Sequence, residues 1–233
     1  MPILVPIDPS VPSRAAVELA ALLAQRLTGR GLFLLHVAPA GPATLDSLAA
    51  LHALAAPAHD AGVEVHLRTV RGDPAPRIVE EARRRKVSWV FMGTRAEAFR
   101  GAARPSVALE VMRTAPGPVV AVRPGQAGPG PVGLIAQAIH GAAHTLARLL
   151  AEAQSRDLLP IVIGPEGTLS TPDGAPVEPA TLVVACDPRC EHSRPCQQVL
   201  DVARCPVLLV RDADGGVAPA LRESTQAVGE ITR

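Results

Sequence analysis

Residues 3–37, ILVPIDPSVPSRAAVELAALLAQRLTGRGLFLLHV, decide the fold of this chain. Ile3–Ile7 and Leu32–Val37 are continuous apolar runs, which are typical of strands buried on both faces of a parallel sheet. Between them, apolar side chains recur at helical spacing after Ser10 or Ser13, either of which can cap a helix. The stretch therefore predicts a strand, a helix and a second strand, with the two strands parallel.

The same alternation continues as far as Arg123. Strands are expected at 63–70, 87–92 and 119–122, and helices at 45–61, 74–86 and 106–114. Together with the opening unit, these segments predict an α/β fold with a doubly wound parallel sheet, in which helices cover both faces.

The remainder of the chain resembles a shorter copy of this first half. Arg14–Val37 aligns without a gap to Gly141–Gly164 at an offset of 127, and Val111–Arg123 aligns to Val199–Arg211 at an offset of 88. The difference between the offsets predicts two tandem copies, of which the second is abbreviated and lacks the middle helix and third strand. Its strands are expected at 132–135, 159–163, 182–185 and 207–210.

These patterns give a domain organisation. We expect a complete α/β domain at 1–124, a Gly/Pro linker at 125–131, a truncated α/β domain at 132–211 and a mobile tail at 212–233.

The composition of the chain argues against several classes of function. The 23 basic and 22 acidic residues leave a net charge of only +1, and aromatic residues make up 2% of the chain, so no nucleic-acid partner is expected. No apolar run is long enough to cross a membrane, and the start, MPILVPIDPS, lacks the basic region of a signal peptide. We expect a cytoplasmic protein without a membrane partner. The chain also lacks the common catalytic motifs, which favours a protein that is not an enzyme.

Four segments carry a family resemblance. They are ILVPIDPS, LLHV, GDPAPRIVEEARRRKVSWVFMGTR and SVALEVMRTAPGPVVAVRP. In their order and spacing they resemble the universal stress protein family. The resemblance implies a flavodoxin-like, usually dimeric stress-response domain, of which many members bind ATP and others do not. It also implies that the two halves pair through the strands at 119–122 and 207–210, about a pseudo-two-fold axis.

The resemblance also implies a nucleotide site in the first half. The matching positions are Asp8, Val37, Gly93, Thr94, Arg95 and Ser106. The phosphate loop departs from the family pattern, because Ala96 and Pro105 replace two of its glycines and the loop is one residue shorter. Arg95, together with Arg100 and Arg104, could replace some of the lost backbone donors.

A plainer interpretation of the same residues stays open. Asp8 followed by Pro is a common turn former, Ser106 is a common helix cap, and arginines in a loop usually face solvent. In the second half, Ile135 stands at the position of Asp8 and Arg194 at that of Ser106. No nucleotide is expected there.

All four cysteines fall in the second half. Cys186, Cys190, His192 and Cys196 lie within eleven residues and could close a tetrahedral zinc site, although their spacing matches no standard zinc motif. Two other interpretations stay open: buried or exposed cysteines without metal, and a redox-sensitive thiol pair. Cys205 is expected in the core.

The leading hypothesis is a non-enzymatic regulatory module that binds ATP or another adenine nucleotide in the first domain. The alternatives are a protein-interaction scaffold without nucleotide, and a metal or thiol sensor that uses the Cys186–Cys196 cluster. Expected partners are the chain itself, through pairing of its halves and a homodimer, and an unknown regulatory protein.

Overall fold

A computed structural model describes residues 2–26, 31–38, 45–95, 106–135, 141–164, 167–186 and 199–211. In these residues nine strands form one sheet in the order β3-β2-β1-β4-β5-β11-β10-β6-β7, and two more form a small sheet, β8-β9. The strands are β1 (Ile3–Ile7), β2 (Leu32–Ala38), β3 (Val65–Arg71), β4 (Trp89–Gly93), β5 (Val119–Arg123), β6 (Val132–Ile135), β7 (Leu158–Pro160), β8 (Val162–Ile163), β9 (Leu169–Ser170), β10 (Thr181–Ala185) and β11 (Val207–Arg211). The helices are α1 (Val11–Arg26), α2 (Leu45–Asp60), α3 (Pro74–Arg85), α4 (Val107–Thr114) and α5 (Ala142–Gln154).

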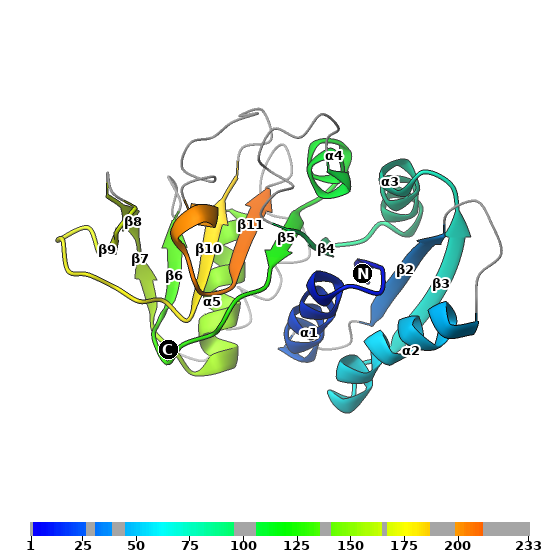
Figure 1. Cartoon of the computed structure of the whole chain (residues 1–233), viewed down its shortest axis with the longest axis horizontal. Coiled ribbons are helices and arrows are strands. Elements are labelled where there is room, and N and C mark those ends of the chain that lie inside the picture. The colour runs from blue at the N-terminus through cyan, green and yellow to red at the C-terminus, as the bar shows by residue number, and fades with distance from the viewer. Residues whose placement is uncertain are drawn as a thin grey trace, which may run out of the picture.

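Helices cover both faces of the sheet, as the sequence predicts. Figure 1 shows α1, α2 and α5 on one side of the strands and α3 and α4 on the other. A separate apolar cluster fills each layer, and each cluster takes residues from both halves of the chain. Val120 and Val183 share one cluster, and Ala121 and Leu182 share the other. The hydrophobic core therefore runs unbroken along the whole sheet.

Local sequence signals set the helix ends. Ser13 donates its N–H to the Oγ of Ser10 at 3.4 Å, and Leu109 donates its N–H to the Oγ of Ser106 at 3.1 Å. Both serines therefore cap helices, which confirms the capping role expected for them. The helix α3 begins at a proline, whose missing N–H would have no intrahelical partner there.

The two halves meet through antiparallel strands. The β5 strand pairs with β11 so that Ala121 faces Leu209, Val119 faces Arg211 and Arg123 faces Val207. Ala121 and Leu209 are aligned positions at the offset of 88. The pairing is therefore symmetric about two positions that the sequence alignment relates. This is the junction expected from the sequence, and every other pair in the large sheet is parallel.

A partly buried arginine, Arg123, and a buried one, Arg211, cross this junction in opposite directions. Arg123 donates from Nη2 to the carbonyl oxygen of Ala203 at 2.7 Å and to the carbonyl two residues later at 3.1 Å. Arg211 donates from Nη1 to the carbonyl of Ala115 at 2.7 Å and to the carbonyl two residues later at 3.4 Å. Donors and acceptors are aligned pairs at the offset of 88. Each half therefore satisfies backbone carbonyls of the other.

The strand expected at 159–163 is wrong. The segment 159–163 is divided, because β7 joins the large sheet while β8 pairs antiparallel with β9. Pro160 lies at the division and has no N–H to donate to a ladder. The expected domain boundaries stay predictions, and the tail at 212–233 lies outside the described residues.

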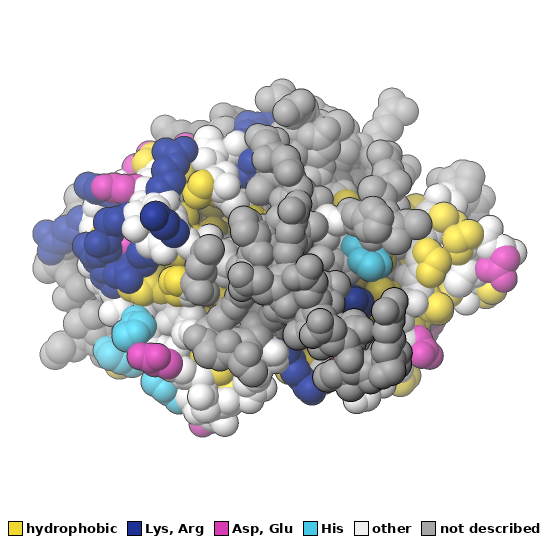
Figure 2. Space-filling view, turned by 180° about the vertical axis from the view of Figure 1, so that it is seen from behind, with side chains coloured by type: hydrophobic (Ala, Val, Ile, Leu, Met, Phe, Trp, Pro, Cys, Tyr) yellow, Lys and Arg dark blue, Asp and Glu magenta, His cyan; other side chains and the backbone are white. Residues whose placement is uncertain are grey.

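Charge is unevenly distributed over the surface. Figure 2 shows Lys and Arg side chains gathered at one end of the molecule, over β3 and α3. The β3 strand is the last of the large sheet at this end.

Replacing Arg211 with Met tests the importance of the crossing arginines. Arg211 is 4% exposed, so its loss leaves buried carbonyl groups without their donor. We expect the free energy of unfolding in urea to fall by about 2 kcal/mol or more. Arg123→Met should give a similar loss because its contacts are equivalent. Arg148→Met is the control, since that side chain is 42% exposed on α5 and its loss should cost less than about 0.5 kcal/mol. Equal stability of the Arg211 variant and the control would contradict the expected role.

Candidate functional site

A cavity of about 710 Å³ opens at the carboxyl ends of β1, β2 and β4. The amino-terminal ends of α1 and α4 and part of α3 complete its walls. Its lining consists of Pro6, Ile7, Asp8, Ser10, Pro12, Ser13, Leu35, Val37, Pro74, Ile78, Met92, Gly93, Thr94, Arg95, Ser106, Val107 and Ala108. The cavity lies beside the point where the strand order turns back on itself, which is where open α/β sheets bind ligands.

The cavity exists because β1 and β4 separate. They pair only at Ile3 with Trp89 and Leu4 with Val90, whereas β1 and β2 stay paired as far as Ile7. Pro6 lies just beyond the last β1–β4 pair and has no N–H to continue it. A proline inside a fully buried strand is therefore a sequence signal for this opening, and it was not used in the sequence analysis.

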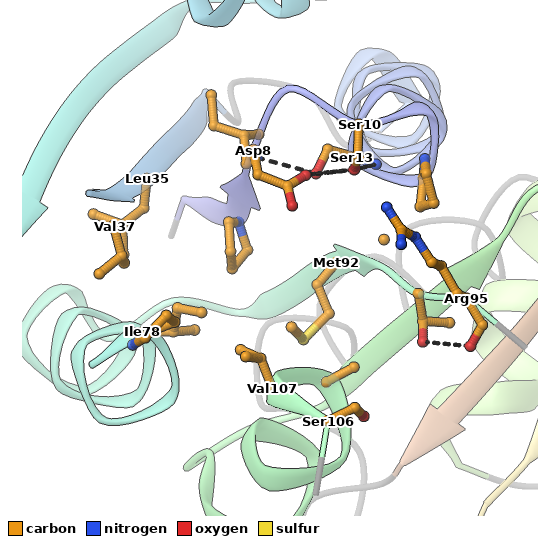
Figure 3. Close-up of a pocket in the computed structure, with 17 residues that line it drawn as sticks. Asp8, Ser10, Ser13, Leu35, Val37, Ile78, Met92, Arg95, Ser106 and Val107 are labelled. Carbon is orange, nitrogen blue, oxygen red and sulfur yellow. Dashed lines mark hydrogen bonds between the residues drawn. The ribbon is translucent and has the colours of Figure 1, made fainter. Parts of the chain in front are cut away.

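The cavity has one apolar end and one polar end. Figure 3 shows Leu35, Val37 and Ile78 together on one side and Arg95 and Ser106 on the other, with Asp8 between them. The apolar side chains belong to the cluster that joins α3 and α4 to the sheet. Such a lining suits a ligand that carries a flat apolar group at one end and charge at the other.

Two serine hydroxyls hold Asp8 in place. Ser10 and Ser13 both donate to Oδ1 of Asp8, and the Asp8 N–H donates back to the Oγ of Ser13 at 3.1 Å. Asp8 itself is exposed, and no described residue donates to its Oδ2. The carboxylate is thus fixed in orientation while one oxygen faces the cavity opening, available to accept hydrogen bonds.

Gly93 is required by packing. A Cβ added there would lie 2.3 Å from the carbonyl carbon of Pro12 and 2.5 Å from the nitrogen of Ser13. The glycine therefore lets the first turn of α1 approach the end of β4. Thr94 is 4% exposed, its N–H donates to the Val122 carbonyl at 2.9 Å and its hydroxyl donates to the Arg95 carbonyl at 3.3 Å. The Thr94 N–H is therefore already hydrogen-bonded to β5.

The polar end combines a helix terminus with one arginine. The N–H groups of Val107 and Ala108 lie in the first turn of α4, where a helix has no internal acceptor for them. The partial positive charge of the helix terminus favours an anion at this position. Arg95 is exposed and forms no ion pair with any described residue. Its guanidinium can therefore bind an anion bidentately.

All the nucleotide-site residues named from the sequence line this one cavity: Asp8, Val37, Gly93, Thr94, Arg95 and Ser106. Sequence reasoning missed Leu35 and Ile78 of the apolar end and treated Ser10 and Ser13 only as candidate helix caps. The spacing of Asp8, Ser10 and Ser13 is the signal that was available, because it places both hydroxyls on the first turn of a helix beside the carboxylate. Four further residues of the expected loop lie outside the described residues: Ala96, Arg100, Arg104 and Pro105.

The corresponding edge of the second half differs in its chemistry. Ile135 ends β6 where Asp8 follows β1. Cys186 donates its N–H to the Val210 carbonyl at 2.7 Å, which is the contact that Thr94 makes with Val122. Ala185 therefore occupies the place of Gly93. Its Cβ and the missing carboxylate make this edge unlike the first.

The zinc hypothesis has no support in the described part of the chain. Cys186 follows β10 as expected, but Cys190, His192 and Cys196 lie outside the described residues. Elsewhere in the described ranges, no three His, Cys, Asp or Glu side chains could hold a metal ion together. Cys205 is 5% exposed in the core as expected, and burial raises the pKa of its thiol.

No helix in the described ranges is both long and apolar enough to span a bilayer.

Replacing Gly93 with Ala tests the close approach of α1. The added methyl group would overlap the backbone around Pro12, which cannot move without shifting the first turn of the helix. We expect a loss of about 2–3 kcal/mol in the free energy of unfolding, measured in urea. Gly128→Ala is the matched control, because a Cβ at Gly128 meets nothing within 4 Å. A Gly93 variant as stable as this control would show that α1 can shift without cost.

Comparison with solved structures places this fold among known proteins. A universal stress protein from Archaeoglobus fulgidus is 16% identical, with a TM-score of 0.61 over 91% of this chain and 97% of its own. A functionally unknown protein from Pseudomonas aeruginosa is 17% identical, with a TM-score of 0.58 over 97% of both chains. Both likenesses extend over both halves of the sheet, and at these identities they concern the fold alone.

A universal stress protein family protein from Arabidopsis thaliana, solved with AMP bound, is also similar. It is 19% identical over 53% of this chain and 91% of its own, with a TM-score of 0.42. At this TM-score the similarity gives no information about a ligand of this chain.

The sequence comparisons complete the assignment. A search of curated proteins finds no significant match. The model of the universal stress protein family matches residues 1–123, which include every strand and helix that lines the cavity. This match covers more than half of the 233 residues, so the chain belongs to the universal stress protein family.

Proposed function

We propose that this chain is a non-enzymatic regulatory module that binds an adenine nucleotide in the cavity of its first half. The observation that carries the proposal is the division of the cavity into an apolar end and an anion-binding end, with a fixed carboxylate between them. A nucleotide has the same order of parts: a flat base, a sugar with hydroxyl groups, and phosphate.

The apolar end fits the base. Leu35, Val37 and Ile78 offer aliphatic surface from β2 and α3, and no charged residue lies among them in the described lining. Val37 is only partly buried, so the end of β2 is accessible to a ligand. Asp8 then lies within the cavity between the two ends, where Oδ2 can accept hydrogen bonds from sugar hydroxyls.

The polar end fits phosphate. The amides at the start of α4 can donate to phosphate oxygens, and the guanidinium of Arg95 can add a bidentate contact. Ser106 uses its oxygen to accept from Leu109, and its own hydroxyl hydrogen is left to donate. Among the described lining residues Arg95 is the one cation, which favours a ligand with few phosphate groups.

The lining also supports binding without turnover. No histidine, lysine or cysteine is among the described residues of the cavity. Asp8 lies next to the sugar position, and two hydroxyl groups already donate to one of its oxygens. The described residues thus offer no general base beside the phosphate end.

We also propose that residues 132–211 are a degenerate second copy of the first unit. The gapless alignments at offsets of 127 and 88 support this, as do the symmetric β5–β11 register and the reciprocal contacts of Arg123 and Arg211. In this arrangement the second copy stabilises the first and does not itself bind a nucleotide.

Thermal unfolding with nucleotides tests the binding proposal. A ligand present at about a hundredfold excess over its Kd should raise Tm by about 5 °C or more. AMP, ADP and ATP should raise Tm, whereas guanine and pyrimidine nucleotides should have smaller effects. If none of the adenine nucleotides changes Tm at millimolar concentration, the proposal fails and the scaffold without nucleotide is favoured.

A substitution at Arg95 tests which end of the cavity binds phosphate. We expect Arg95→Gln to weaken AMP binding about tenfold, because a charge-assisted contact is lost, and to leave adenosine binding unchanged. Isothermal titration with both ligands measures the difference. Arg148→Gln is the control with the same change of charge on α5, distant from the cavity. Equal losses for AMP and adenosine would mean that Arg95 does not contact phosphate.

Prolonged incubation with ATP tests the absence of turnover. We expect the phosphate released to equal that in buffer alone, because no described group can activate water at the phosphate end. Release that scales with protein concentration, and that Asp8→Asn abolishes, would contradict a non-enzymatic function.

A further inference from the structure

One buried carboxylate on α3 forms ion pairs with three arginines of α3 and β3. Glu81, whose side chain is 7% exposed, contacts Arg68 at 3.1 Å, Arg84 at 2.8 Å and Arg85 at 3.2 Å. Burial raises the pKa of Glu81, but hydrogen bonds from Arg84 and Arg85 and the charge of Arg68 outweigh it, so that the pKa is lowered. The carboxylate stays ionised, and its single negative charge leaves two of the three positive charges unbalanced.

The positive surface extends beyond this cluster. We define the basic face as Arg68, Arg71, Arg77, Arg83, Arg84, Arg85 and Lys86, on β3, α3 and its carboxyl end. These seven cations fall in residues 68–86, which hold only three acidic residues, although the whole chain has a net charge of +1. The rest of the chain is therefore net acidic. All members of the basic face except Arg85 are exposed, and Figure 2 shows Lys and Arg side chains gathered at this end of the molecule, with acidic side chains among them.

Packing holds the side chains of this face in place. The Cζ of Arg85 lies 3.5 Å from the ring centroid of Phe33, and Arg77 donates from Nε to the Arg71 carbonyl at 3.1 Å. Arg83 donates to the Thr114 carbonyl at 3.2 Å. Guanidinium groups that are already positioned lose less entropy when a partner binds.

The basic face adjoins an open strand edge. Of the described strands, only β2 pairs with β3, and this pairing runs through all seven residues from Val65 to Arg71. The outer edge of β3 therefore presents backbone N–H and C=O groups without a strand partner in the described part of the chain. The opposite end of the sheet differs, because β7 has only three residues and ends in Pro160.

We propose that the basic face and the outer edge of β3 bind an acidic, extended segment of a partner protein. The segment adds a strand to the sheet beside β3, and its carboxylates contact the arginines of β3 and α3. Backbone hydrogen bonds give such an interaction its affinity, and charge gives it its specificity.

A protein partner fits this surface better than a nucleic acid. Phe33 is the aromatic side chain at this position, and it is 3% exposed beneath Arg85, so it offers no surface on which a base could stack. The contacts with Glu81 show that these guanidinium groups already bind a carboxylate in the folded chain.

Fluorescence anisotropy of the full chain tests this proposal. The probe is a fluorescein-labelled peptide of about eight residues in which Glu alternates with Thr, a pattern suited to one strand. We expect saturable binding that weakens as NaCl is raised from about 50 mM to about 300 mM. The same peptide with Gln in place of Glu, and the acidic peptide with alternate backbone amides N-methylated, should both bind much more weakly.

Charge reversal identifies the surface. The double variant Arg71→Glu, Lys86→Glu should weaken the acidic peptide about tenfold, since neither residue pairs with a described acidic group. The control is Arg14→Glu, Arg148→Glu, which changes net charge equally on α1 and α5 and should bind normally. Equal effects of both double variants would overturn the proposal. So would tight binding of the N-methylated peptide, or preferential binding of a single-stranded oligothymidine.

Discussion

The antiparallel pairing of β5 with β11 is the contact on which the rest of the sheet depends. Without it, two parallel sheets would each end in an open edge strand of four apolar residues and one arginine, which favours aggregation. With it, apolar layers continue from one half to the other on both faces. The register centres on Ala121 and Leu209, and the arginine that ends each strand donates to backbone carbonyl groups of the other half. Hydrogen bonds and hydrophobic burial therefore act together at one junction.

The same sheet provides the cavity by leaving a pair of strands incomplete. The β1 strand pairs with β2 as far as Ile7 but with β4 only as far as Leu4. Pro6 has no N–H with which the β1–β4 pairing could continue. Gly93 then allows α1 to close over the end of β4. In the second half Ala185 replaces this glycine and Ile135 replaces the carboxylate. A small number of side chains thus distinguishes the edge that carries the cavity from the edge of the sheet beside β6 and β10.

The two edge strands of the large sheet also differ in what limits their pairing with another chain. The short β7 strand ends in a proline, which limits further pairing. The β3 strand is longer and is protected mainly by charge, because arginines on β3 and α3 repel a second basic edge. A partner of opposite charge would meet no such barrier.

The sequence by itself determined most of the order of strands and helices, the two candidate caps Ser10 and Ser13, and the cavity residues from Asp8 to Ser106. These follow from local patterns and from short motifs at the ends of strands. Only the tertiary structure decided that β1 and β4 separate after Leu4, that Gly93 is needed for the approach of α1, and that Pro160 divides the expected strand. It also decided that Arg123 and Arg211 cross the junction. Each of these depends on which backbone lies opposite a residue in space, and the pattern of a single segment carries no information about its distant neighbours.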